Sequence, residues 1–224
     1  MSVTEYEIKH LNGLLSLMAN KVEEAINKSI IALLTNDTEL TEEIKECEGE
    51  INDLDIKIDQ QCIKLLALKQ PMAQDLRLIT TAMKITSELE RMADNAFNIA
   101  KRTKSMKGEK FPEEHHEDIK KMETMSQSMV AKSVEAFVTK NKEMSLSVIM
   151  EDEKVDKINK KICKESFMMM TKNPKAINIA LIVSYVSKHM ERIADHATNV
   201  AEMAIYLIDG KNVRHIQPKD LIKE

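Results

Sequence analysis

The chain has 224 residues, of which 43% are hydrophobic and 31% are charged, and its formal net charge is -4. A chain of this length can bury a sizeable core in one large domain or two small ones. Acids and bases are mixed along it, which excludes the basic excess that a nucleic-acid-binding surface requires, so we expect no nucleic-acid partner.

Six long helices are predicted, separated by the few residues that break helices. Gly and Pro number four each and aromatic residues make up 3% of the chain, which disfavours β-rich folds. The predicted helices cover 4–35, 38–69, 71–106, 113–139, 142–172 and 174–208. Thr38 is the expected N-cap of the second helix, Pro71 and Pro174 are expected helix starts, and Gly210 is the expected final C-cap. Because the loops are short, successive helices should be antiparallel neighbours.

A phrase in the third predicted helix occurs again in the sixth. ELERMADNAFNIAK (88–101) and HMERIADHATNVAE (189–202) are identical at seven of fourteen positions, and the offset is 191 - 90 = 101. Self-similarity at a fixed offset indicates an internal repeat, here of three helices. The sequence therefore predicts an all-α fold of two tandem antiparallel three-helix bundles, 1–108 and 109–210, followed by a C-terminal tail, 211–224.

The repeated phrase places acidic residues four positions apart, so they lie on one face of each helix. The preceding helices carry a second row, formed by Asp152 and Asp156 in the second half and by a stripe of Glu48, Asn52, Asp55 and Asp59 in the first. The predicted metal ligands are Glu48, Glu90, Asp94, Asp152, Asp156, Glu191 and Asp195. Facing carboxylates at a core edge need raised pKa values or a cation. Their hard oxygen atoms suit magnesium, calcium, manganese or iron, and two rows can hold more than one ion.

A solvated acidic surface is the alternative to a metal site, because acidic residues four apart are common in helices. In that interpretation, Arg91 and Arg192 would neutralise their helical neighbours. The matched registers in both halves favour the metal site. The residues expected beside its ligands are Asn52, Asn98, Asn199, Arg91, Arg192 and His196. His196 is equally compatible with an ordinary contact between helices.

Other sequence features point away from an enzyme and towards the cytoplasm. There is no phosphate-binding glycine loop or nucleophile elbow. A carboxylate-bridged oxidase or hydrolase is the alternative function, but the acidic rows lack the histidine at i+3 that di-iron bundles use. Three cysteines without a CxxC pair suggest reduced thiols. No signal peptide or membrane-length apolar run is apparent.

The chain resembles the PhoU family of phosphate-signalling regulators. The resemblance covers about residues 4–210 and is carried by ERMADNAFNIAK, ERIADHATNVAE, LLALKQPMAQDLRLI and EDEKVDKI. It implies tandem three-helix bundles with metal clusters, of iron or zinc in some members, on the acidic motifs. Asn52 departs from the family pattern, which expects a carboxylate there. Asp75, Leu76 and Arg77 have no counterpart in the second half, and either a partner surface or a local ion pair would explain them.

The resemblance also implies partners. It suggests a cytoplasmic adaptor between the ATPase subunit of a phosphate ABC transporter and a sensor histidine kinase, restraining phosphate-starvation signalling when phosphate is plentiful. Association with those membrane proteins would be peripheral. Metal identity and formation of a homodimer are left open.

Overall fold

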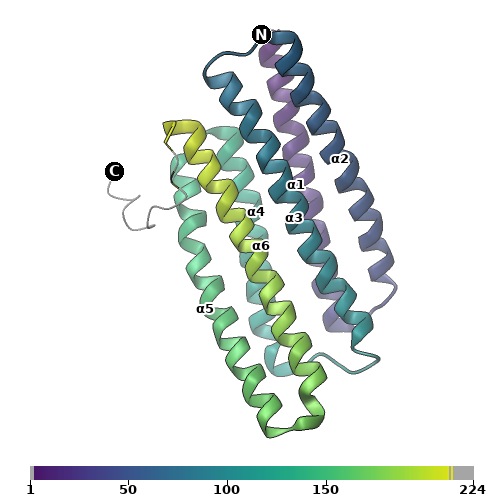
Figure 1. Cartoon of the computed structure of the whole chain (residues 1–224). Coiled ribbons are helices and arrows are strands. Elements are labelled where there is room, and N and C mark those ends of the chain that lie inside the picture. Colours follow the sequence, from purple (N-terminus) through teal and green to yellow (C-terminus); the bar gives the residue numbers. More distant parts are fainter. Residues whose placement is uncertain (1–2, 212, 214–224) are drawn as a thin grey trace.

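The computed structural model describes residues 3–211 and 213, and within them six long α-helices are joined by short turns and two 3-10 segments (Figure 1). The elements are α1 (Val3–Thr35), α2 (Leu40–Lys69), α3 (Gln74–Ser105), η1 (Glu113–His115), α4 (His116–Thr139), α5 (Lys142–Lys172), η2 (Pro174–Ala176) and α6 (Ile177–Asp209). The predicted all-α fold of two three-helix bundles is confirmed. The predicted tail, 211–224, lies outside the described residues apart from Lys211 and Val213.

Three helix ends differ from the sequence prediction, each for a local reason. The N-cap prediction at Thr38 was wrong, because the Asp37 carboxylate accepts hydrogen bonds from the Glu39 and Leu40 amides at 2.9 and 3.3 Å. Pro71 precedes α3 by a short turn, and Pro174 opens the 3-10 segment before α6. The C-cap at Gly210 is confirmed: its φ is 72° and its N–H donates to the Tyr206 carbonyl at 3.0 Å.

The hydrophobic core runs through both bundles. Leu11, Leu15 and Met18 line the buried stripe of α1, and a single cluster of buried side chains includes residues from all six long helices. α1 packs against α4, and α3 packs against α6 (Figure 1). The two bundles therefore lie side by side with a shared interior, and each relies on the other to cover part of its apolar surface.

Arg77 fastens the start of α3 to the end of α6. Its Nη1 atom donates to the Leu207 carbonyl at 3.4 Å, and its guanidinium lies 5.5 Å from the centre of the Tyr206 ring. A Cβ atom added to Gly210 would lie 2.9 Å from the same Nη1 atom, but this flexible side chain can move aside, so the positive φ is what favours a glycine at this C-cap. The first-half residue without a counterpart in the repeat thus makes a contact within the chain.

Candidate metal centre

The acidic row of the second bundle is formed where α5 packs against α6. Asp152 has its pKa raised to about 7, first because its carboxyl is buried and then because Asp195, Asp156 and Glu191 lie close enough to repel its charge. Asp195 is exposed at the edge of the row, and partial desolvation of its carboxyl, with the charge of Glu191, raises its pKa. The structure therefore brings the four acidic residues predicted in this half within range of one another's charges.

Asp152 also carries an oxygen atom that lacks a partner. Its Oδ1 is buried without a hydrogen bond from any described residue, and the same is true of the Thr198 hydroxyl. The Thr198 hydroxyl lies close enough to Asp152 to favour its charged form as a donor would, but the two groups do not meet the geometry of a hydrogen bond. Buried oxygens without partners are rare and costly in folded proteins. A hard cation would satisfy both atoms, so this oxygen-rich set fits a metal such as magnesium, manganese, calcium or iron.

Part of the charge in this row is already compensated. The buried Glu191 carboxylate pairs with the Lys188 ammonium one turn earlier in α6. Among the described residues, no group of three or more His, Cys, Asp or Glu side chains is already arranged to hold a metal ion. A bound cation would therefore require these carboxylates to turn towards one another, and Glu191 to share its charge between Lys188 and the metal.

The first bundle has a looser version of the row, where α2 packs against α3. Burial raises the pKa of Glu90, and the charges of Asp94, Asp55 and Glu48 add to the shift. Asn52 is exposed. Phe97 occupies the position equivalent to Thr198, since 198 - 101 = 97. This half thus lacks both a carboxylate and a hydroxyl that the second half has, and Asp55 joins the row in addition to the predicted ligands.

His196 and Asn199 are not directed at the metal row. His196 Nδ1 lies 2.7 Å from Glu88 Oε2 of α3, and Asn199 Nδ2 donates to the same oxygen at 3.0 Å. Burial alone would raise the pKa of Glu88, but these two hydrogen bonds outweigh it and hold the pKa below its usual value. His196 and Asn199, expected beside the metal ligands, instead join the two bundles.

A second polar contact crosses the same helix pair at the equivalent positions. His189 Nδ1 lies 2.7 Å from Asn95 Oδ1. The repeat offset of 101 makes His189 equivalent to Glu88, since 189 - 88 = 101, and His196 equivalent to Asn95, since 196 - 95 = 101. The His189–Asn95 contact therefore joins the same two positions of the repeat as the Glu88–His196 contact, with the two halves exchanged. The α3–α6 interface is therefore built with approximate twofold symmetry. The sequence analysis missed Glu88 and Asn95, although the aligned repeat contains both positions.

The remaining predicted neighbours stay at the surface. Arg91 and Arg192 are exposed. The charge of Arg91 lowers the pKa of Glu88 and Glu90, but in Glu90 burial and the neighbouring carboxylates outweigh it. Asn98 is half-buried beside the first row. Arg91 therefore offsets only part of the charge of the first row.

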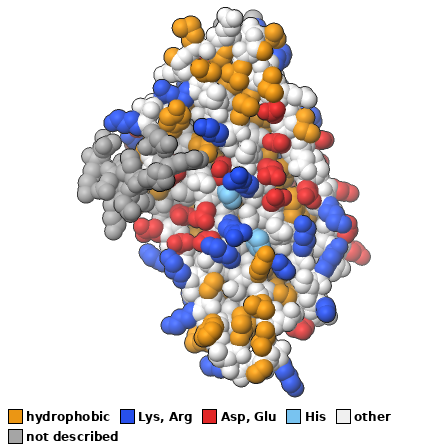
Figure 2. Space-filling view, in the orientation of Figure 1, with side chains coloured by type: hydrophobic (Ala, Val, Ile, Leu, Met, Phe, Trp, Pro, Cys, Tyr) orange, Lys and Arg blue, Asp and Glu red, His pale blue; other side chains and the backbone are white. Residues whose placement is uncertain are grey.

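The surface reflects this distribution of charge. Figure 2 shows acidic side chains across the middle of one face, interleaved with Lys and Arg side chains, and hydrophobic side chains towards its two ends. None of the described helices combines the length and hydropathy needed to cross a membrane.

Comparison with known proteins gives consistent matches along the chain. The family model described as the PhoU domain matches residues 15–103 and 119–204, one segment in each bundle. A phosphate-specific transport system accessory protein PhoU homolog of Aquifex aeolicus is 39% identical, with 91% of each chain covered. A homolog of the same name from Clostridium acetobutylicum is 35% identical, covering 94% of this chain and 96% of the relative.

Solved structures match equally well. The crystal structure of PhoU from Pseudomonas aeruginosa superimposes with a TM-score of 0.86 at 32% identity, covering 92% of this chain and 99% of that one. The phosphate transport system regulatory protein PhoU from Streptococcus pneumoniae gives a TM-score of 0.86 at 30% identity, covering 94% and 99%. These names describe accessory and regulatory proteins rather than enzymes.

Proposed function

Because the chain belongs to the PhoU family, we propose that it is a cytoplasmic, metal-binding adaptor that restrains phosphate-starvation signalling and modulates a phosphate ABC transporter. The named relatives are accessory proteins of a phosphate-specific transport system, and the matches extend over nearly the whole of both chains. A regulatory role in phosphate transport therefore rests on the entire fold rather than on one motif.

The metal-binding part of the proposal is carried by the surroundings of Asp152. Asp152 is half-buried and has one fully buried oxygen without a partner, and three further carboxylates lie close to it, so the protein itself leaves much of this charge uncompensated. Asp152, Asp156, Glu191 and Asp195 would hold the metal, with Thr198 beside them. A bound multivalent cation would supply the positive charge that lets the acidic faces of α5 and α6 lie together. Glu48, Glu90 and Asp94 would form a weaker site in the first bundle.

The partners proposed are the ATPase subunit of the transporter and a sensor histidine kinase, both contacted from the cytoplasmic side. Regulation would then act through docking rather than through turnover of a substrate. Signalling interfaces of this kind are often small, polar and transient. Two helical bundles with a shared core offer rigid surfaces of mixed charge for such contacts.

The cellular test compares expression of phosphate-scavenging genes in rich phosphate. A strain lacking the protein should express these genes even when phosphate is plentiful, and the intact protein should restore repression. Asp152→Asn together with Asp195→Asn should restore it poorly, whereas Glu153→Gln, an exposed neighbour on α5, should restore it fully. Normal repression in the deletion strain would overturn the adaptor role, and full repression by the double variant would overturn the role of the metal row.

A further inference from the structure

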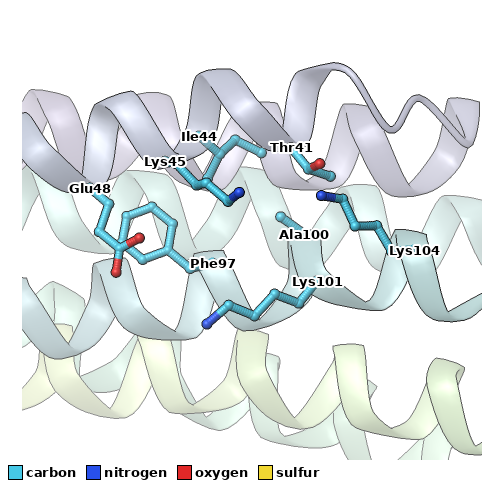
Figure 3. A pocket seen from close by; sticks show the side chains of 8 residues that line it. All are labelled: Thr41, Ile44, Lys45, Glu48, Phe97, Ala100, Lys101 and Lys104. Atoms are coloured by element: carbon cyan, nitrogen blue, oxygen red, sulfur yellow. The ribbon is translucent and has the colours of Figure 1, made fainter.

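A pocket of about 180 Å³ lies between α2 and α3, beside the first acidic row (Figure 3). Its floor is apolar and is formed by Ile44, Phe97 and Ala100. Three lysines, Lys45, Lys101 and Lys104, stand around this floor, and Glu48 lies at the opposite end from Lys104. The floor is almost covered, with Phe97 4% exposed, so the flexible lysine side chains act as its movable walls.

The three lysines differ in the ion pairs that they form within the chain. Lys45 and Lys104 both pair with the exposed Glu42, at 2.7 and 2.8 Å. Hydrogen bonds from these two ammonium groups lower the pKa of Glu42 to about 2. Lys101 lies in the same rim, and its ammonium group has no hydrogen-bond or ion-pair partner among the described residues. The rim therefore already binds one carboxylate and has an ammonium group left for a second.

The internal repeat shows that the fold does not require these lysines. Equivalent positions of the repeat differ by 152 - 48 = 104 residues between α2 and α5, and by 101 residues between α3 and α6. Each pocket lysine therefore has an equivalent position in the second half. Lys45 corresponds to Ile149 and Lys104 to Ile205, both buried, and Lys101 corresponds to Glu202. At the equivalent location, the second bundle has two buried isoleucines and a glutamate, whereas the first bundle has a pocket lined by three lysines.

We propose that this pocket is a docking site for an acidic segment of a partner protein, which inserts one large apolar side chain between α2 and α3 and pairs a carboxylate with Lys101. The volume and apolar floor suit a single side chain, and the lysine stems would cover its sides. The positive rim selects an acidic partner by charge complementarity. The inference deepens the proposed adaptor role, on which it rests.

Glu48 gives the docked segment a direction. Its carboxylate would repel an acidic group at its end of the pocket, whereas Lys104 lies at the opposite end and the Lys101 ammonium lies on the side away from α2 (Figure 3). The acidic residue of the partner should therefore lie beside the Lys101 ammonium, on the side of the pocket away from α2 and Glu48, with the apolar side chain resting on Phe97. Because Glu48 also belongs to the first acidic row, docking takes place directly beside a proposed metal ligand.

The test uses a displayed library of 12-residue peptides selected against the full chain. The protein contains no tryptophan, so Phe97→Trp supplies a single fluorescent reporter at the pocket floor. Selected peptides should share a large apolar residue within two positions of Asp or Glu, and they should change the emission of this reporter. The double variant Lys101→Glu with Lys104→Glu should weaken their binding about tenfold or more, and Lys57→Glu, an exposed lysine elsewhere on α2, should leave binding unchanged.

Several results would overturn the docking site. They are selection of no peptide, selection of peptides without acidic residues, equal binding by the lysine double variant with unchanged helicity, and equal loss with Lys57→Glu. Metal content measured on the same variants separates this inference from the proposed function. Loss of peptide binding with normal metal content is the expected pattern, and peptide binding that persists in the double variant refutes the pocket while leaving the metal row intact.

Discussion

Neutralising Asp152 should stabilise the metal-free protein. Its pKa is raised from 3.8 to about 7, because the carboxyl is buried and is repelled by Asp195, Asp156 and Glu191. A carboxyl whose pKa is higher in the folded state favours folding below its unfolded pKa, and that contribution is lost as the pH rises through about 7. Asp152→Asn keeps the shape of the side chain and removes the charge that causes the loss.

The magnitude follows from the shift. At about 1.4 kcal/mol for each pKa unit, a rise of roughly three units corresponds to at most about 4 kcal/mol at pH 8. The neighbouring carboxylates share this repulsion and partly relax when one charge is removed, so we expect the variant to gain about 2 kcal/mol. For a chain of this size, that gain raises the Tm by about 4–8 °C.

The assay is thermal unfolding followed by circular dichroism at pH 5 and pH 8, after treatment with a chelator. The variant should unfold at a higher temperature than the wild type at pH 8, and the difference should shrink at pH 5. Glu153→Gln, an exposed neighbour, should change the free energy of unfolding by no more than about 0.5 kcal/mol. A variant that is less stable than the metal-free wild type at pH 8 would show that the acidic row is not electrostatically strained.

Three further predictions concern the contacts between the bundles and their links. Glu88→Ala should cost about 2–3 kcal/mol, because it leaves His196 unpartnered between α3 and α6; a double-mutant cycle with His196→Ala that gives no coupling would contradict this. Trypsin should cut first in the exposed 107–110 link, and size-exclusion chromatography should then recover both bundles together, since they share a core; early cutting within 75–100, or separation of the halves, would argue against this packing. Gly210→Ala should lower stability by about 1 kcal/mol, because of its positive φ, and urea unfolding that shows no loss would contradict this.

The fold could be predicted from the sequence because the patterns that define each helix are local. Apolar residues at helical spacing, such as Leu11, Leu15 and Met18, and a few breakers define the helices, and the duplicated phrase defines the repeat. The errors lie at helix starts, where one side chain decides. Asp37 rather than Thr38 bonds the first amides of α2, and both are residue types that commonly cap helices.

The site could be predicted only in part, because many of its contacts join residues that are far apart in the sequence. The spacing of Asp152 with Asp156, and of Glu191 with Asp195, identified one acidic face on each helix. It could not show that Thr198 faces Asp152, because a single threonine in a helix gives no distinctive pattern. The pairing of Glu88 with His196 depends on how α3 crosses α6, which joins residues more than a hundred positions apart. Such contacts depend on tertiary packing and leave no periodic trace in either segment.

Metal titration of the chelator-treated protein by calorimetry tests the central claim most directly. Wild-type protein should bind at least one of Mg²⁺, Mn²⁺, Fe²⁺ or Zn²⁺. Asp195→Asn should bind fewer ions or bind them more weakly, with its helicity nearly unchanged. If none of the four ions binds the wild type, or if Asp195→Asn binds them equally well, Asp152, Asp156, Glu191 and Asp195 are not a metal site.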